Sequence, residues 1–251
     1  MASIVVPGEH VPAQHVNLKL GPGLLQLSAH RAQPPNSHLI ISTRAGQLDH
    51  SANKSRWWVE CNARRYVPAS QESVIGIVLG RSGDGWRVDI GSGHPALLDG
   101  LAFEGATRRS KPNLKVRCQS VSHLSNQSVL QVGALVYARV SLAHKDMEPE
   151  LECFDAQTHK AEGFGELSGG FVMQCSLRMS RLLLDPKHFL LPFLGSRFPL
   201  EVAVGMNGRT WISAKGVKQT IAVVRCIEAV DPDGAGMEEG DLKKLFNRLE
   251  I

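Results

Sequence analysis

The sequence has no apolar run long enough to cross a membrane. A spanning helix needs about 18 to 20 mostly apolar residues, and no run in the 251 residues approaches that length. Met1–Gly8 also lacks the charged start and the long apolar stretch of a secretory signal. We therefore expect a soluble intracellular protein that has no membrane partner.

Cysteine and histidine are present, but not in the patterns of a disulfide framework or a metal site. The five cysteines are odd in number, far apart and free of any CxxC pair: Cys61, Cys118, Cys153, Cys175 and Cys226. The ten histidines show no HxxxH or HExxH spacing. We expect reduced, mostly packed thiols, no metal site and no cofactor.

Signatures of common enzyme classes are also missing. There is no GxSxG, no Walker loop and no Rossmann fingerprint, and Gly80–Gly85 (GRSGDG) fits none of them. We therefore expect no catalytic residues and no enzymatic activity.

Length and composition indicate several small globular domains. Hydrophobic residues make up 43% of the chain and charged residues 21%, which is ordinary for a folded protein. Because 251 residues exceed the usual length of one domain, we predict three. They are a β module over 1–65, a second β module over 66–154 and an α+β module over 155–251, with Arg64–Pro68 as the first linker.

The first two modules contain mostly short strands. In the first we expect strands at Ile4–Val6, Leu24–Leu27, His38–Ser42 and Arg56–Cys61. The second begins with a hairpin, in which Ser82–Gly85 joins Val74–Leu79 to Trp86–Ile90, and continues with Ala96–Leu98, Ala134–Leu142 and Leu151–Phe154. Five short strands with one long connection are typical of an OB barrel, which offers an open face to oligonucleotides.

The third module mixes strands and helices. A flexible glycine-rich lead over 163–170 precedes a strand at Phe171–Gln174 and a helix at Ser176–Leu184 that stops before Pro186. A hairpin of Leu200–Val204 and Trp211–Ser213 follows, and helices at Lys218–Val230 and Glu239–Leu249 complete the module. The predicted fold is therefore mainly β with an α+β C-terminal part.

The segment Gly205–Gly208 (GMNG) has two interpretations. A GxxG loop between two helices is the clamp by which KH domains grip single-stranded nucleic acid. Here the flanking segments are predicted strands, which favours a structural turn in which Asn207 and Gly208 have positive φ angles.

Two further patterns lie on predicted strands. Alternation places Trp86 in the core and Arg87 on the surface, although an exposed Trp86 would stack a base. The alternating Asp146, Glu148, Glu150 and Glu152 are consistent with a hard cation site or with a solvated acidic face, and Pro149 and the lack of a calcium-binding loop favour the acidic face.

Positive charge is concentrated in one part of the chain. The net charge is +4, and no acidic residue lies between Glu104 and Asp146. Seven basic residues fall in that interval: Arg108, Arg109, Lys111, Lys115, Arg117, Arg139 and Lys145. Correctly placed cations dominate affinity for nucleic acid, so this interval is a candidate RNA footprint. A solvated basic surface and a protein-docking patch explain the charge equally well.

Several stretches together resemble one family. They are VVPGEHV (Val5–Val11), RRYVP (Arg64–Pro68), VIGIV (Val74–Val78), SGDGWRVDIG (Ser82–Gly91), LAFEGATRRSKPN (Leu101–Asn113), HKDMEPELEC (His144–Cys153) and GMNGRTWI (Gly205–Ile212). With them the chain resembles the S1/KH cap subunits of the eukaryotic RNA exosome, in particular the family of ribosomal-RNA-processing protein forty, also called exosome component three.

The resemblance implies a fold and a role. It implies an N-terminal domain that docks on the exosome ring, a central S1-type OB domain and a C-terminal KH-type domain, with no activity of its own. Members hold the ring together with other cap subunits and guide RNA through the central channel to a separate 3′-to-5′ exoribonuclease, including in ribosomal RNA maturation. They are expected in the nucleus and nucleolus and also in the cytoplasm. The family's GxNG variant, matched by Gly205, Asn207 and Gly208, is understood as structural.

The sequence departs from the family at one place. Leu114–Leu130 intervenes where the family runs almost directly into the next barrel strand, and it is either an extra polar surface loop or translated non-coding sequence. Our hypothesis for the site is that Arg108, Arg109, Lys111 and Lys145, with Arg87 as a further candidate, guide RNA by backbone charge. The alternative function is that of another S1/KH RNA-binding adaptor acting outside the exosome.

Overall fold

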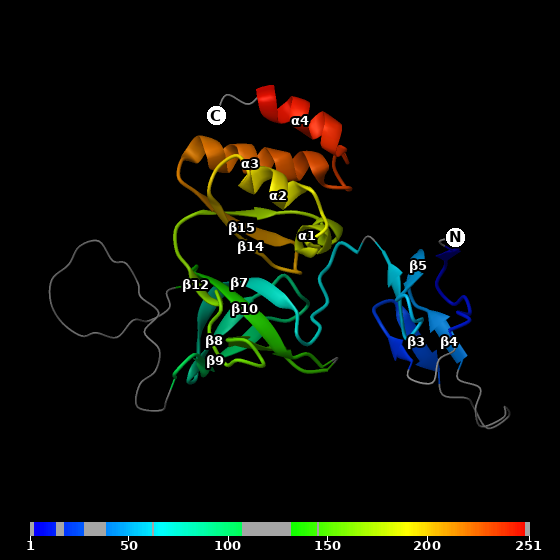
Figure 1. The fold of residues 1–251 in the computed structure, drawn as a ribbon. Helices are drawn as coiled ribbons and strands as arrows, with labels where there is room; N and C mark the ends of the chain where they lie inside the picture. The colour runs from blue at the N-terminus through cyan, green and yellow to red at the C-terminus, as the bar shows by residue number, and fades with distance from the viewer. Residues whose placement is uncertain are drawn as a thin grey trace. The chain divides into compact units, whose positions relative to one another are not determined.

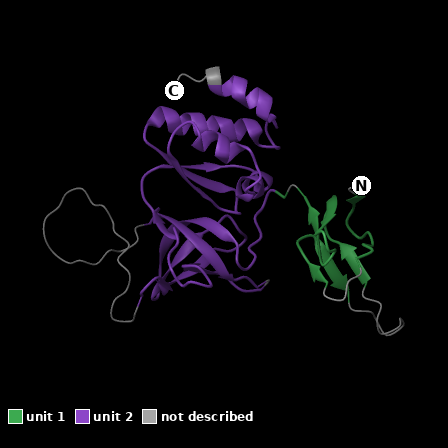
Figure 2. Ribbon diagram, in the orientation of Figure 1, with its two compact units in different colours: residues 1–63 green, residues 64–251 purple. Residues whose placement is uncertain are grey.

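The computed structural model describes residues 3–13, 18–27, 39–61, 63–106, 132–144 and 146–248. The chain divides into two compact units, residues 1–63 and 64–251 (Figure 2). One buried hydrophobic cluster lies in the first unit and two lie in the second. The sequence predicts three modules. The second and third form one compact unit, because buried polar contacts join them.

The first unit is a small β structure. Its strands are β1 (Ser3–Val5), β2 (Lys19–Leu20), β3 (Leu24–Leu27), β4 (Leu39–Ser42), β5 (Gly46–His50) and β6 (Arg56–Glu60). They form a four-stranded sheet in the order β1-β5-β6-β2 and a separate β3-β4 pair. Alternation in β6 buries Trp57 and Val59, which pack with Val5, Ile40 and Leu48. Strands β2 and β5 were not predicted, since β2 is two residues long and Leu48 is the only large apolar residue of β5.

The second unit begins with a closed barrel. Its strands are β7 (Ser73–Ser82), β8 (Gly85–Asp89), β9 (Ala96–Phe103), β10 (Leu135–Leu142) and β11 (Glu150–Cys153). The order β11-β9-β8-β7-β10 closes through the β10–β11 pairing (Figure 1). Only β9 and β11 pair in parallel within this barrel. The predicted five-stranded OB barrel is confirmed, with the Ser82–Gly85 turn at the end of its first hairpin.

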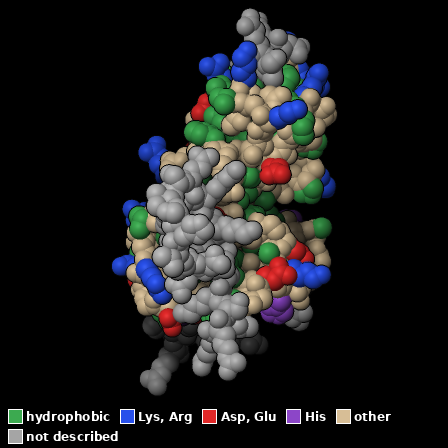
Figure 3. All heavy atoms as spheres, turned by 90° about the vertical axis from the view of Figure 1, so that its left-hand side faces the viewer, with side chains coloured by type: hydrophobic (Ala, Val, Ile, Leu, Met, Phe, Trp, Pro, Cys, Tyr) green, Lys and Arg blue, Asp and Glu red, His purple; other side chains and the backbone are tan. Residues whose placement is uncertain are grey.

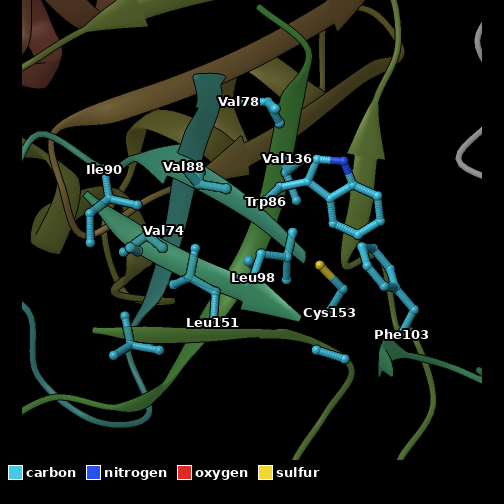
Figure 4. Close-up of a cluster of buried hydrophobic side chains, with 14 of the residues drawn as sticks. Val74, Val78, Trp86, Val88, Ile90, Leu98, Phe103, Val136, Leu151 and Cys153 are labelled. Atoms are coloured by element: carbon cyan, nitrogen blue, oxygen red, sulfur yellow. The ribbon is translucent and has the colours of Figure 1, made fainter. Parts of the chain in front are cut away.

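The barrel interior explains the alternation seen in the sequence. Inward side chains of all five strands meet in one cluster (Figure 4), including Val74, Val88, Leu98, Val136 and Leu151. Each of these five is at most 2% exposed. Burial on this scale stabilises a domain by about 25 cal/mol for each Å² of apolar surface removed from water, so the barrel is the rigid part on which surface residues are held.

The rest of the second unit has the element order β-α-α-β-β-α with one added helix. The elements are β13 (Phe171–Gln174), α1 (Leu177–Leu184), α2 (Leu190–Gly195), β14 (Leu200–Val204), β15 (Arg209–Ala214), α3 (Val217–Val230) and α4 (Glu239–Arg248). The sheet order is β13-β15-β14, α3 packs against β15, and α4 packs on α3 (Figure 1). Among the described helices, none is long and apolar enough to cross a membrane.

Local capping fixes where the first helix of this module begins. The Ser176 hydroxyl accepts a hydrogen bond from the Met179 amide at 2.9 Å, as an N-cap residue does. Both the hydroxyl and the amide of Ser176 donate to the Asp231 carboxylate at the end of α3, at 2.6 and 2.8 Å. One buried carboxylate therefore ties the start of α1 to the end of α3.

Two sequence predictions for this module were wrong. The glycine-rich lead contains a strand, β12 (Gly165–Leu167), which pairs with β10. Phe164 beside it stacks on Tyr137 of β10 at 4.9 Å between ring centroids, and this contact fixes the segment on the barrel. Helix α2 was also missed, because Pro192 lies inside it. Proline is tolerated there since it falls in the first turn, where amides have no intrahelical partner.

Candidate nucleic-acid interface

The structure describes one of the five predicted RNA-contacting residues. Arg108, Arg109, Lys111 and Lys145 lie outside the described residues, as does the whole 114–130 segment. The structure therefore places Arg87 alone, and the proposed role of the other four stays a prediction.

Arg87 lies on the outer surface of the barrel. Its neighbours in β8, Trp86 and Val88, point inward and are buried, so strand alternation turns the guanidinium outward. Its Nη2 atom is 3.8 Å from Oε1 of Glu148, and the two side chains are 51% and 53% exposed. An ion pair this long and this exposed contributes little to stability, so the guanidinium is free to exchange its partner for a phosphate.

The outer face around Arg87 offers charge rather than aromatic rings. The outward positions of β8 and β9 carry Arg87, Asp89, Leu97, Asp99 and Leu101. Trp86 is only 8% exposed and packs edge-on against Phe103 with 6.0 Å between ring centroids. The core interpretation of Trp86 is confirmed, and the outward positions described for β8 and β9 include no ring on which a base would stack.

Arg139, counted above in the basic interval, is buried. It is 6% exposed. Its guanidinium donates to Oε1 of Gln71 at 2.7 Å, to Oε2 of Glu152 at 2.6 Å and to the Phe154 carbonyl at 3.3 Å. Alternation places Arg139 on the face of β10 opposite the inward Val136, Ala138 and Val140, and there these three acceptors cover its charge. Including Arg139 in an RNA footprint was therefore wrong.

The predicted acidic face is solvated at Asp146, Glu148 and Glu150, whereas Glu152 is partly buried. Glu152 neutralises the buried Arg139, and Glu148 faces Arg87 on the surface. Two of the four carboxylates therefore serve as partners of arginines on β8 and β10. Among the described residues, no group of His, Cys, Asp and Glu is arranged to hold a metal ion.

The GMNG segment is the turn between β14 and β15. The Gly208 amide donates a hydrogen bond to the Gly205 carbonyl at 3.2 Å, and this bond closes the turn. Gly208 has φ +77°, a conformation that glycine adopts without steric cost. The prediction that Asn207 also has a positive φ was wrong. In this longer loop, the left-handed conformation of Gly208 is enough to complete the turn.

Asn207 bonds to the barrel rather than to its own loop. Its Oδ1 accepts from the Ile75 amide at 3.2 Å, and its Nδ2 donates to the carbonyls of Ile75 and Ile90 at 2.8 and 2.9 Å. The side chain is 8% exposed. A Cβ on Gly205 would overlap Asn207 Oδ1 and lie 2.7 Å from the Ile75 amide nitrogen, so the close approach of the loop to the barrel requires glycine there.

Arg209 adds a charged contact beside Asn207. Its Nη2 donates to Oδ2 of Asp89 at 2.6 Å, and its Nη1 donates to the Asp89 carbonyl at 2.6 Å and to the Ile75 carbonyl at 3.3 Å. Partial burial of Asp89 opposes its ionisation, but the hydrogen bonds from Arg209 and from the Gly91 amide outweigh this and lower the pKa of the carboxyl. Sequence reasoning missed Arg209, although it directly follows GMNG in the string that carried the family resemblance.

These contacts occupy the polar groups with which a GxxG loop would grip a nucleic-acid backbone. The Met206 amide donates to the Ser73 carbonyl at 2.8 Å, and the Gly205 amide donates to the Arg209 carbonyl at 2.8 Å. The position between two helices, where a KH clamp lies, is filled by Asp185–Phe189 and has no glycine. The α+β module therefore uses GMNG to hold the barrel and not to grip a nucleic-acid backbone.

The described cysteines have the character of packed thiols. Cys61, Cys153, Cys175 and Cys226 are free of disulfides. Burial raises the pKa of Cys153, with a smaller contribution from Glu152, and burial raises the pKa of Cys226 to about 11. Thiols held protonated in this way are poor nucleophiles.

Models of known domain families match successive parts of the chain. Residues 18–65 match the N-terminal domain of exosome complex exonuclease Rrp40. Residues 66–122 and 121–165 match the S1 domain of exosome complex component RRP40, and residues 170–218 match a KH domain. The matched ranges follow the order of the β unit, the barrel and the α+β module.

Whole proteins match over most of their length as well. The chain is 43% identical to exosome complex component rrp40 of Schizosaccharomyces pombe, over 90% of this chain and 88% of that protein. It is 36% identical to exosome complex component RRP40 of Homo sapiens, over 84% of this chain and 71% of that protein. The crystal structure of a protein assigned as an exosome complex RNA-binding protein shares the fold, with a TM-score of 0.56 at 24% identity over 74% of this chain and 95% of that one.

Proposed function

Because this chain belongs to the RRP40 family of exosome complex components, we propose that it is a non-catalytic RNA-binding cap subunit of the RNA exosome. In this role it stabilises the ring and guides RNA into the central channel, where a separate 3′-to-5′ exoribonuclease degrades or processes it, ribosomal RNA included. Its partners are RNA, the ring subunits, the other cap subunits and that exoribonuclease.

One observation carries the RNA-guiding part of the proposal. The face of an OB barrel is a common platform for oligonucleotides, and here its outward cation Arg87 is held only by a long, exposed ion pair. The described part of this face carries Arg87, Asp89 and Asp99 and no exposed ring, so Arg87 is its one group suited to RNA, and it suits phosphates rather than bases. We therefore expect weak, sequence-tolerant binding that falls steeply with salt.

The other predicted RNA-contacting residues lie outside the described part and enter the proposal through their place in the sequence. Arg108, Arg109 and Lys111 follow the end of β9, and Lys145 follows the end of β10. Replacing Arg108, Arg109 and Lys111 together by Glu is expected to lower RNA crosslinking in the assembled exosome while the chain still co-elutes with the core. If these residues contact a ring subunit instead, the same variant will elute apart from the core, and the RNA assignment fails.

The proposed role implies a cellular location and membership of a complex. We propose nuclear and nucleolar pools with a cytoplasmic one, as suits a subunit that serves ribosomal RNA maturation and general RNA decay. The alternative is an S1/KH adaptor acting outside the exosome, and size-exclusion chromatography of a native extract separates the two. A cap subunit elutes with the core, whereas an adaptor elutes free of every ring subunit.

A further inference from the structure

A groove with an apolar lining lies beside helix α3. It has a volume of about 680 Å³ and lies between the N-terminal two-thirds of α3 and the adjoining ends of β13 and β15. Three of its lining side chains are large, apolar and exposed, namely Phe171 at 52%, Val217 at 76% and Ile221 at 47%. Single exposed apolar residues are ordinary on protein surfaces, but several around one groove indicate a binding surface.

The position of Phe171 shows that the helices leave one margin of the sheet uncovered. Along β13, Phe171 and Met173 point to the same face of the sheet, and Met173 is buried in the cluster beneath the helices. Strand β13 is at the edge of the three-stranded sheet, so Phe171 lies on the helix-covered face at its uncovered margin. Another apolar element placed beside α3 would cover it.

Helix α3 supplies the opposite wall. Val217, Ile221, Val224 and Glu228 recur at helical spacing and line the groove, while Ala222, Val223, Cys226 and Ile227 turn into the core. The stripe from Val217 to Glu228 is about 16 Å long at the helical rise of about 1.5 Å per residue. An elongated segment therefore fits this surface better than a compact ligand does.

Charge at the rim indicates the chemistry of the occupant. Lys215 and Arg225 line the groove, and Lys218 is exposed beside it on the first turn of α3. Among the described residues, none of these three cations has an ion-pair partner, and Glu228 is the one acidic residue in the lining. In the space-filling view, hydrophobic and basic side chains lie next to one another over the helical part of the second unit (Figure 3).

We propose that this groove is a docking site for an amphipathic, acidic segment of another subunit of the exosome core. Apolar side chains of the segment cover Phe171 and Ile221, and its carboxylates face Lys215 and Arg225. The segment binds as a peptide does in an apolar groove, and the charges at the rim determine its orientation. This inference rests on the proposed membership of the exosome.

The test measures binding of the full-length chain to an exosome core reconstituted without it. Phe171→Ser combined with Ile221→Ser is expected to raise the Kd for the core at least about tenfold, as loss of a hydrophobic anchor does. Lys215→Glu combined with Arg225→Glu should also raise the Kd. The matched control is Leu184→Ser, which replaces a side chain that is 44% exposed in the same module, away from the groove, and its Kd should stay within about twofold of wild type.

Hydrogen exchange identifies the occupant in the same samples. Protection of residues 213–228 on joining the core, lost in the Phe171→Ser and Ile221→Ser variant, is the expected result. Protection that appears with single-stranded RNA alone, or with concentrated chain alone, would overturn the proposal in favour of RNA or a second copy. Equal binding of all variants with unchanged exchange would also overturn it. Failure of the wild-type chain to bind the core at all would instead refute the proposed function.

Discussion

The guanidinium of Arg209 in the α+β module lies 2.6 Å from the carboxylate of Asp89 at the end of barrel strand β8. The arginine side chain is 9% exposed and the aspartate side chain 38%. Together with Asn207, this pair joins two hydrophobic cores that sequence patterns assign to separate modules. The GMNGR segment is thus a connection between the two modules, made by the turn between β14 and β15.

Removing the arginine should weaken this connection. Arg209→Ala removes the charged partner of Asp89 and one of the two donors to the Ile75 carbonyl, and we expect a loss of about 2 to 3 kcal/mol in the free energy of unfolding. The loss stays below that of a fully buried pair because water screens the partly exposed Asp89. Urea unfolding measures it, with the exposed Lys187→Ala as control. Equal stability of the two variants would contradict the assignment.

The same pair predicts how stability depends on pH. The pKa of Asp89 in the folded chain lies below its ordinary value of 3.8, so its stabilising effect is complete above that value and is lost as the pH falls through the folded pKa. The difference in unfolding free energy between wild type and Asp89→Asn should therefore be constant above about pH 5 and shrink as the pH falls below 3.8. A difference that grows in acid would show that the carboxylate does not stabilise the fold.

Asn207 should be as important as the charged pair. Asn207→Ala removes the side-chain partner of the Ile75 amide and of the Ile90 carbonyl, and leaves the Ile75 carbonyl with only the longer bond from Arg209. We expect this to cost about 2 to 4 kcal/mol. Asn207→Asp, nearly equal in shape, places an oxygen against the Ile75 and Ile90 carbonyls, so it should be at least as damaging. Thermal unfolding followed by tryptophan fluorescence tests both. A melting temperature unchanged within about 2 °C would be inconsistent with the observed contacts.

Arg87 is exposed and Arg139 is buried, so the same substitution should have different effects at the two positions. Arg139→Gln should lower the unfolding free energy by about 2 to 4 kcal/mol because Glu152 loses its buried partner, while RNA affinity of the folded fraction stays the same. Arg87→Gln should change stability by less than about 0.5 kcal/mol and weaken RNA binding. Fluorescence anisotropy with a single-stranded RNA, beside urea unfolding, separates the two effects. If Arg87→Gln destabilised the fold and Arg139→Gln weakened RNA binding, the assignment of Arg87 as exposed and Arg139 as buried would be wrong.

Glu148 competes with phosphate for Arg87 in this account. Glu148→Gln removes a negative charge 3.8 Å from the guanidinium, so RNA should bind about two to three times more tightly at low salt, an effect that fades as salt screens it. Anisotropy titrations at two salt concentrations measure this. Weaker binding by Glu148→Gln would show that the carboxylate orients Arg87 for RNA instead of blocking it.

Much of the fold could be predicted from local patterns. Alternation around a tight glycine turn gave the β7–β8 hairpin, and Asp185-Pro186 after an apolar helical face marked the end of α1. Strand β12 could not be found in this way, because Gly165–Leu167 becomes a strand only by pairing with β10 and by the stacking of Phe164 on Tyr137. Elements that depend on a distant partner carry no local signal of their own.

The same limit applies to the site. The alternation of β8 was enough to turn Arg87 outward and Trp86 inward. The partners of Asn207 lie 117 and 132 positions away in the chain, so no spacing rule indicates them, and Arg139 looked like surface charge until its three acceptors were seen. The family resemblance supplied the structural interpretation of GxNG, whereas the contacts explain it.

The central claim is that this chain holds and steers RNA while another subunit cuts it. The most direct test incubates the purified full-length chain alone with a labelled single-stranded RNA and then adds the chain to a core that contains the exoribonuclease. The account predicts RNA of unchanged length with the chain alone, and faster 3′-to-5′ degradation in the complex with wild type than with the Arg108, Arg109 and Lys111 charge-reversal variant. Shortening of the RNA by the isolated chain would contradict it.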